Sequence, residues 1–198
     1  MSKRVLTSFV CGLAVVFLMT SFASAKNPKG PSGPAGKSNV AHLYLYEKSE
    51  TDWQILEKGA WGKMKYRMSG PSFKFVFNGK KLIPGEEYTL IYYPDPWPGN
   101  GLICLGTDVA NRGGNFHIKE AAFIDTDLPM EGDLNHPANP LHAECIANST
   151  CIEGAKIWVV LSSDVDCTGQ MMNGWTPAEY LFEDVGIFFD YTEPVVPE

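Results

Sequence analysis

Apolar side chains recur at every second position along much of the chain. This is the period of a β-strand whose two faces meet different surroundings. The clearest runs cover residues 63–68, 72–78, 88–93, 115–119 and 185–190. Clusters of Gly, Pro and Asn separate these runs, as turn residues do. The pattern predicts many short strands joined by turns.

The segment AKIWVVLSS (155–163) differs, because it is nearly continuously apolar. Such a run is typical of a central strand that is buried on both faces. Together with the alternating runs it predicts an all-β fold. We expect an antiparallel two-sheet sandwich, Ig-like or jelly-roll-like, with about seven to nine strands.

One short helix is predicted near the C-terminus. Thr176-Pro177-Ala178-Glu179 has the form of a capping box with Pro at the first helical position, and it leads into Tyr180-Leu181-Phe182. We expect this helix to pack Trp175 and Phe182 across one end of the sandwich.

The N-terminal residues have the order of a secretory signal peptide. Lys3 and Arg4 precede an uncharged run from Val5, and Ala23-Ser24-Ala25 supplies small residues for cleavage between Ala25 and Lys26. The alternative is a retained membrane anchor, because the uncharged run is long enough to span a bilayer. Its strongly apolar part is shorter, which favours cleavage. The sequence therefore predicts a secreted protein, extracellular or periplasmic, with no membrane contact after cleavage.

The chain divides into a signal peptide (1–25), a flexible Gly/Pro-rich leader (26–39), one β-sandwich domain (40–193) and a tail (194–198). Within the domain, residues at about 127–153 resemble a loop insertion, because they are polar and interrupted by prolines. Asn148-Ser149-Thr150, inside this insertion, has the form of a glycosylation acceptor.

The charge balance narrows the range of partners. The chain has 16 basic and 23 acidic residues, and cleavage removes Lys3 and Arg4, which leaves 14 against 23 and a formal net charge of −9. A field of this sign repels nucleic acid and anionic lipid, so neither is expected as a partner.

Four cysteines remain after cleavage, and an even number in an exported chain indicates two disulfides, with three possible pairings. Cys145 and Cys151 lie in one polar loop, where a local disulfide forms easily. That pairing leaves Cys104 with Cys167, which closes a long loop between two strand regions. The long loop is expected to matter more for stability.

Four sequence blocks indicate a relationship to other proteins: AWGKMKY (60–66), YTLIYYPDPWPGNGLICLG (88–106), GAKIWVVLSSDVDC (154–167) and GWTPAEYLFE (174–183). They resemble a family of uncharacterised secreted prokaryotic β-domain proteins that share the YPDPWPGNGLICLG block. The resemblance implies an exported, disulfide-containing β-domain and no particular catalytic residue. The 127–153 loop is expected to be an elaboration specific to this chain.

The loop YYPDPWPGNG (92–101) is the strongest candidate for a binding site. Its prolines stiffen the backbone, so that Tyr93 and Trp97 present rigid aromatic faces beside Asp95 and Asn100. Such surfaces suit sugar rings or a protein partner, because little side-chain entropy is lost on docking. The alternative is that Trp97 folds over the end of the sandwich and only fills space.

The residue types allow two metal sites, one for calcium and one for zinc. Oxygen ligands for calcium are available from acidic side chains at Asp125, Asp127, Glu131, Asp133, Asp164 and Asp166, but their spacing breaks the EF-hand pattern and favours a solvated acidic loop. His136 and His142 with Cys145 and Cys151 have the residue types of a zinc site, although paired cysteines in an exported loop favour a disulfide. We therefore expect no cofactor, with calcium as the open alternative.

A basic stripe is formed by Lys63, Lys65, Arg67 and Lys74. It suits an anionic glycan or an acidic partner, but we interpret it as a set of charges that keep a strand from pairing with other chains.

The signals for catalysis are weak. Neither G-x-S-x-G nor H-E-x-x-H occurs in the chain. Asp95 with Asp164 is a pair of carboxylates without support from spacing, and His42 and His117 lie in strand patterns, facing outward, with no visible Ser or Asp partner. This favours a non-catalytic protein.

Three functions remain open from the sequence. The preferred one is an exported module that binds carbohydrate or a surface protein through Tyr93, Asp95, Trp97 and Asn100. The second is a secreted hydrolase, with or without calcium. The third is a structural subunit of a surface layer or extracellular matrix.

Overall fold

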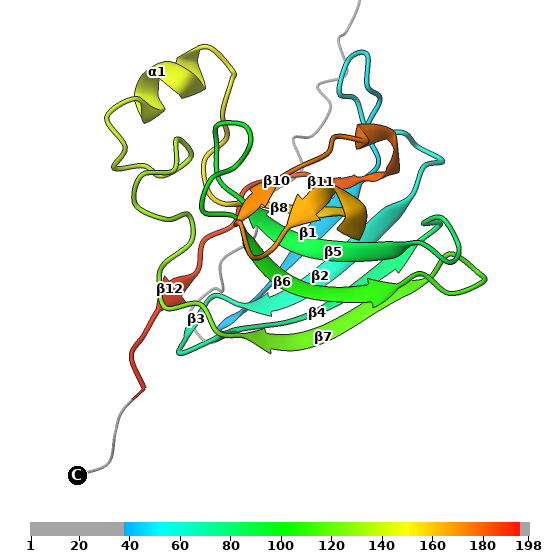
Figure 1. Cartoon of the computed structure of the whole chain (residues 1–198). Helices are drawn as coiled ribbons and strands as arrows, with labels where there is room; N and C mark the ends of the chain where they lie inside the picture. The colour runs from blue at the N-terminus through cyan, green and yellow to red at the C-terminus, as the bar shows by residue number, and fades with distance from the viewer. Residues whose placement is uncertain (1–37, 195–198) are drawn as a thin grey trace, which may run out of the picture.

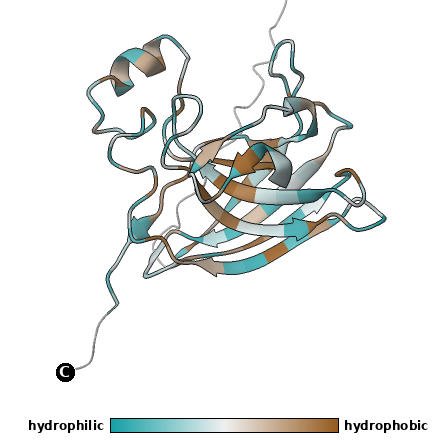
Figure 2. Ribbon diagram, in the orientation of Figure 1, coloured by the Kyte–Doolittle hydropathy of each residue, from teal (hydrophilic) through white to brown (hydrophobic). Residues whose placement is uncertain are grey.

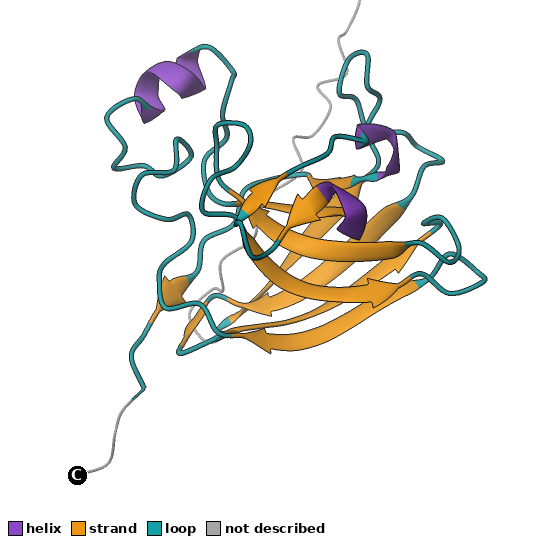
Figure 3. Cartoon of the chain, viewed as in Figure 1, coloured by secondary structure: helices purple, strands orange, loops and turns teal. Residues whose placement is uncertain are grey.

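The structure is a computed structural model that describes residues 38–194. The predicted signal peptide with its Ala25–Lys26 cleavage site, most of the 26–39 leader and most of the 194–198 tail lie outside the described residues. Strands form the body of the molecule and the helical segments are short (Figure 3). The long strands are β1 (Val40–Tyr46), β2 (Trp61–Arg67), β4 (Phe73–Lys80), β5 (Glu87–Tyr93), β6 (Ile103–Val109), β7 (Phe116–Ala122) and β8 (Lys156–Leu161). The shorter elements are β3 (Ser69–Gly70), α1 (His142–Ala147), η1 (Ser162–Asp164), β9 (Val165–Asp166), β10 (Met171–Met172), η2 (Pro177–Glu179), β11 (Leu181–Glu183) and β12 (Asp190–Tyr191).

Eight strands form one antiparallel sheet, in the order β6-β5-β8-β11-β1-β2-β4-β7. The sheet curls until its two edge strands, β6 and β7, pack against each other (Figure 1). The predicted all-β, antiparallel class is therefore confirmed. The predicted two-sheet sandwich is not confirmed, because these strands are hydrogen-bonded in a single, nearly closed sheet rather than in two stacked ones.

The alternating sequence pattern explains why the sheet curls around a core. Along β4, Phe73, Phe75 and Phe77 are buried, while Lys74 between them is exposed. Equivalent side chains of β1, β2 and β7 point into the same interior. Figure 2 shows the most hydrophobic ribbon around β8 and β11 and hydrophilic colour on the turns. β8 lies between β5 and β11 and is buried along nearly its whole length, as its continuous apolar run predicts.

The predicted C-terminal helix is wrong in extent. Only the 3-10 turn η2 forms, and Thr176 makes no side-chain cap hydrogen bond. The residues that would continue a helix pair with the sheet instead, because Leu181 and Phe182 of β11 lie opposite Val159 and Trp158 of β8. The α-helix of the described chain is α1, inside the 127–153 insertion, where the sequence pattern predicts only loop.

The run 185–190 also differs from its prediction as a strand. Ile187 and Phe189 are buried but make only isolated bridges, to Ala155 and to Leu128. Strand pairing begins again at β12, which pairs with β3 in parallel orientation.

Two disulfides cross-link the molecule, and they are the pairs that the cysteine spacing predicts. Cys104 of β6 is joined to Cys167, and Cys145 of α1 to Cys151. Such bonds are typical of proteins from oxidising compartments. Within residues 38–194, no helix has the length and apolar character needed to cross a membrane.

Candidate functional site

An open cleft of about 540 Å³ lies where the 92–101 loop meets the insertion. We call it the aromatic cleft. Its walls are mostly apolar and are formed by Tyr93, Asp95, Pro96, Trp97, Leu134, Cys145, Thr150, Trp158 and Trp175. Four of these residues (Tyr93, Asp95, Pro96 and Trp97) belong to the 92–101 loop predicted from the sequence, and the others come from distant parts of the chain.

The 92–101 loop holds Trp97 at the rim of the cleft, where its side chain is 52% exposed. Two backbone hydrogen bonds hold the loop against the β9–β10 hairpin. The Met172 amide donates to the Pro98 carbonyl at 2.9 Å, and the Gly101 amide donates to the Gln170 carbonyl at 3.1 Å. Gly99 has φ +78°, and a Cβ there would lie 2.5 Å from the ring of Tyr93. A glycine at this position therefore allows the loop to fold closely over Tyr93.

Aromatic rings pack against one another across the cleft. Tyr93 is buried and stacks on Trp158, with ring centroids 3.9 Å apart and an interplanar angle of 13°. Trp97 meets Trp175 edge to face at 5.5 Å, and Trp175 is itself 44% exposed. Because burial raises its pKa, Tyr93 remains neutral over the physiological range. The rigid base and the two exposed indoles form a preorganised apolar surface.

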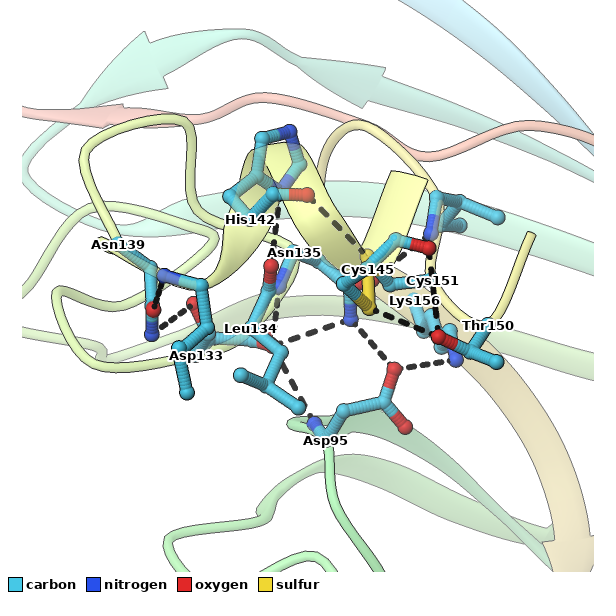
Figure 4. Close-up of a disulfide and its surroundings, with 12 residues drawn as sticks. Asp95, Asp133, Leu134, Asn135, Asn139, His142, Cys145, Thr150, Cys151 and Lys156 are labelled. Carbon is cyan, nitrogen blue, oxygen red and sulfur yellow. Dashed lines mark hydrogen bonds and ion pairs between the residues drawn. A yellow bond between two sulfur atoms is a disulfide. The ribbon is translucent and has the colours of Figure 1, made fainter. Parts of the chain in front are cut away.

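Asp95 does not project freely into the cleft. Its carboxylate forms an ion pair with Lys156 of β8 and accepts a hydrogen bond from the Asn135 side-chain amide at 2.9 Å (Figure 4). Asp95 and Lys156 are both mostly buried, so this pair is screened less than a surface ion pair. The pair fixes the loop to the sheet and to the insertion at the same point.

Asp133 completes this network from the insertion. It is 3% exposed, accepts from the Tyr92 hydroxyl at 2.5 Å, and also accepts from the backbone amide of Asn135 at 2.9 Å. The side-chain oxygen of Asn135 accepts from the Ile152 amide at 2.9 Å. Burial, followed by the nearby Asp133 carboxylate, raises the pKa of Tyr92 and keeps it a proton donor. The insertion is thus anchored where its two ends approach β5 and β8.

A second hollow of about 430 Å³ adjoins the aromatic cleft and shares Thr150, Trp158 and Trp175 with it. We call it the Glu183 compartment. Its other lining residues are Lys48, Trp53, Ser149, Cys151, Ile152, Lys156, Phe182 and Glu183. Trp53 meets Phe182 edge to face at 5.3 Å, so this wall is aromatic too.

Glu183 is a buried carboxyl group, 6% exposed, and its Oε2 atom has no hydrogen-bond partner among the described residues. Burial raises its pKa to about 7, and Lys156 and Lys48 oppose this rise. The Lys48 ammonium donates to the Glu183 backbone carbonyl at 2.9 Å. A carboxyl group with a perturbed pKa beside a cleft is a common feature of functional sites.

The structure uses the other predicted residues differently. Asn100 is exposed in the same turn but does not line either hollow. The calcium candidates are dispersed: Asp127 accepts from the Tyr191 amide, Asp164 accepts from the Tyr180 hydroxyl, and Asp166 accepts from the Thr168 amide, while Asp133 belongs to the network above and Asp125 and Glu131 are exposed.

The zinc candidates are also used structurally, because Cys145 and Cys151 are joined and His142 Nδ1 lies 2.7 Å from the Leu134 carbonyl. His136 Nδ1 accepts from the Ala138 amide at 3.1 Å. Within residues 38–194, no group of three or more His, Cys, Asp or Glu side chains is arranged to hold a metal ion.

The basic stripe lies on the outer face of the sheet. Lys65, Arg67 and Lys74 line a shallow hollow there with Lys119. β2 lies between β1 and β4, so these charges do not protect an edge strand, which corrects the interpretation from the sequence. They form a cationic surface on an acidic chain.

The carboxylate pair weighed for catalysis is not brought together in one cleft. Asp164 lines neither hollow and is bonded to Tyr180. His42 and His117 are exposed on the outer face, and His117 Nδ1 lies 2.9 Å from the Asn78 side-chain oxygen.

Comparisons with known proteins give no functional assignment: no family model, no curated protein and no solved structure matches the chain. The residues of the candidate site that sequence reasoning missed are Trp53, Trp158, Trp175 and Glu183. The only sequence signal for the three tryptophans is the total of five in the chain, and their spacing does not indicate that they meet Trp97. No sequence signal indicates Glu183.

Proposed function

We propose that this chain is an exported, non-catalytic module that binds carbohydrate or a surface protein in the aromatic cleft. The supporting observation is the convergence of four of the five tryptophans on the two adjoining hollows. Three of them, Trp53, Trp97 and Trp175, are 44–52% exposed. Apolar rings left exposed together mark interaction sites in soluble proteins.

The chemistry of the cleft agrees with this proposal. Rigid indole rings offer large contact areas at small entropic cost. Asp95, the charged group in the wall of the cleft, is fixed by Lys156 and Asn135, so binding requires little reorganisation of this side chain. Secretion, and kinship with the prokaryotic proteins that share the YPDPWPGNGLICLG block, remain parts of the proposal that rest on the sequence.

The test is a glycan-array and pull-down screen of wild type against Trp97→Ala. We expect the variant to lose at least about tenfold in affinity, because an aromatic anchor at a binding site contributes about 1.4 kcal/mol or more. Trp61→Ala is the matched control, since Trp61 of β2 is 39% exposed and lines neither hollow. Equal binding by Trp97→Ala and wild type would reject the site.

A hydrolase is the second candidate, and Glu183 is the observation that favours it. A buried carboxyl group with pKa about 7 has the property of a general acid, while Asp95 beside Lys156 supplies a second carboxylate in the adjoining cleft. Incubation with linear hexasaccharides followed by product analysis tests it. Cleavage by wild type and none by Glu183→Gln would replace the non-catalytic proposal.

A further inference from the structure

Four cationic side chains on the outer face of the sheet surround a hollow of about 520 Å³, which we call the cationic hollow. They are Lys65, Arg67, Lys74 and Lys119, and all four are exposed. Val40, Val76 and Ala121 line the hollow between them. Positive charges held near one another repel, and protection of an edge strand does not account for those on β2 and β4. Their arrangement therefore requires another explanation.

The strand register brings these charges together. β2, β4 and β7 are neighbours in the sheet (Figure 1). Lys65 lies opposite Val76, and Val76 lies opposite Lys119, so the two lysines flank Val76 on one face, about 10 Å apart across β4. Arg67 and Lys74 each lie two residues further along their strands, which corresponds to about 7 Å. The result is a group of charges that repeats along the strands.

Acidic side chains do not neutralise this group. β1, β2 and β4 contain no Asp or Glu. Glu120 of β7 is turned toward β6, because its Cγ would lie 3.3 Å from a Cβ on Gly106. None of the four cationic side chains forms an ion pair within residues 38–194. Burial, followed by the charges of Lys63 and Lys65, lowers the pKa of His42 on the same face, which indicates an unopposed positive field.

The kind of side chain limits the partner. Three of the four cations are lysines, which are compact point charges without the rigid fork of arginine. They suit several loosely spaced anionic groups better than one phosphate or carboxylate held in a fixed geometry.

The apolar surroundings limit the partner further. None of the large apolar side chains that are exposed lines the hollow. The hollow therefore lacks the anchors of a protein interface, the inserted side chains of a membrane surface and the stacking rings of a single-stranded nucleic acid site. A nucleic acid duplex is a thick rod of dense negative charge, and it would also meet the acidic remainder of a chain with 23 acidic and 16 basic residues. A thin polymer with one charge per unit avoids both difficulties.

We infer that the cationic hollow binds an acidic polysaccharide, with carboxylate or sulfate groups at the four cationic side chains and a sugar ring over Val76. This site goes beyond the proposed function, because it shares no residue with the aromatic cleft. It gives the basic stripe a role in binding and gives the chain a second binding surface, on the outer face of the sheet.

The experiment measures binding of the protein to immobilised polygalacturonate and dextran sulfate, with neutral dextran as the control polymer. We expect at least one acidic polymer to bind at 50 mM NaCl and neutral dextran not to bind. Affinity should fall at least about tenfold between 50 and 200 mM NaCl, because salt screens the charges and competes with the protein for the polymer. The polymer that binds identifies the anionic group.

A pair of double variants tests the location. Lys65→Gln/Lys119→Gln should weaken binding at 50 mM NaCl about fivefold, because two exposed charge contacts are lost. Lys58→Gln/Arg112→Gln is the matched control, since it removes two charges from exposed positions that do not line the hollow. The control should bind as wild type does. Thermal melts establish that each variant is folded.

Four results would overturn the inference. They are no binding of either acidic polymer, equal losses in the two double variants, binding of anionic phosphatidylglycerol vesicles or duplex DNA as tight as that of the polysaccharide, and loss of polysaccharide binding in Trp97→Ala. The last result would place the polymer in the aromatic cleft. If Trp97→Ala instead binds the acidic polymer as wild type does, this inference stands whether or not the aromatic cleft has a ligand.

Discussion

At the scale of single residues, Glu183 is a carboxyl group held in an environment that disfavours its ionised form. An ionised carboxylate without a full set of partners is poorly stabilised when it is removed from water. The two lysines offset part of this cost, yet the pKa remains raised to about 7 from its ordinary value of 4.5. Natural proteins retain such groups where function requires them.

This side chain predicts a pH dependence of stability. The folded state binds the Glu183 proton more tightly than the unfolded state does. The contribution of this proton to the free energy of unfolding is therefore fully present below pH 4.5 and is lost as pH rises toward 7. A shift from 4.5 to about 7 corresponds to about 3 kcal/mol. We therefore expect the free energy of unfolding of Glu183→Gln to differ from that of wild type only by a constant offset at pH 4.5. By pH 8, the free energy of unfolding of the variant should have risen by about 3 kcal/mol relative to wild type.

Urea denaturation at a series of pH values measures this difference, in which other titrating groups such as Asp184 cancel. Glu131→Gln is the control, because Glu131 is exposed in the insertion. Parallel profiles for wild type and Glu183→Gln would show that the raised pKa is wrong.

At the scale of elements, the insertion at 127–153 forms a wall of both hollows although it is the least regular part of the fold. α1 has only six residues, no side-chain cap and no buried residues. A helix of this length is not stable alone. It is held by the Cys145–Cys151 disulfide and by the network of Asp133, Asn135 and Asp95 (Figure 4).

The short disulfide should therefore matter more for binding than for global stability. Closing a loop with a sequence separation of 6 contributes about 2 kcal/mol in the chain-entropy model. For Cys145→Ser/Cys151→Ser we expect a loss of that size or smaller, together with a loss of affinity of at least about tenfold for any ligand of the aromatic cleft. Hydrogen exchange should show lower protection across the insertion and unchanged protection in β4, which is the internal control. Unchanged affinity in the folded variant would show that the wall does not depend on this bond.

At the scale of the whole molecule, one curled sheet encloses one core, and the long disulfide fastens the edge strand β6 to the segment after β9. The β9–β10 hairpin in turn holds the 92–101 loop through Met172 and Gln170. The segment around the β9–β10 hairpin therefore stabilises both the edge strand β6 and the 92–101 loop of the candidate site.

Loss of the long disulfide should be the more destabilising change. Its sequence separation of 63 corresponds to about 4 kcal/mol, against a typical total stability of about 5–15 kcal/mol. Cys104→Ser/Cys167→Ser should lower the free energy of unfolding by about this amount, measured in the same urea series as the short-disulfide variant. An equal or smaller loss than that of Cys145→Ser/Cys151→Ser would contradict the chain-entropy argument.

Local sequence patterns predict the strands correctly where the burial of neighbouring side chains determines the structure. The alternation around Phe73, Phe75 and Phe77 predicts β4, and the apolar run at 155–163 predicts the buried β8. The helix predicted at 176–179 does not form, because strand pairing of Leu181 and Phe182 outweighs a capping signal.

Of the predicted site, Tyr93, Asp95 and Trp97 line the cleft, whereas Asn100 does not. Asp95 was expected to face a ligand, but it is paired with Lys156, a residue 61 positions away.

The amino-acid sequence by itself determined the strand-rich class, the two cysteine pairs and the stiff aromatic loop, since these follow from periodicity, spacing and residue type over short distances. Only the tertiary structure decided that the strands close into one sheet, that Trp53, Trp158 and Trp175 join Trp97, and that Glu183 is buried beside them. Those features depend on contacts between residues far apart in the chain, and the burial that raises the pKa of Glu183 exists only after the sheet has curled.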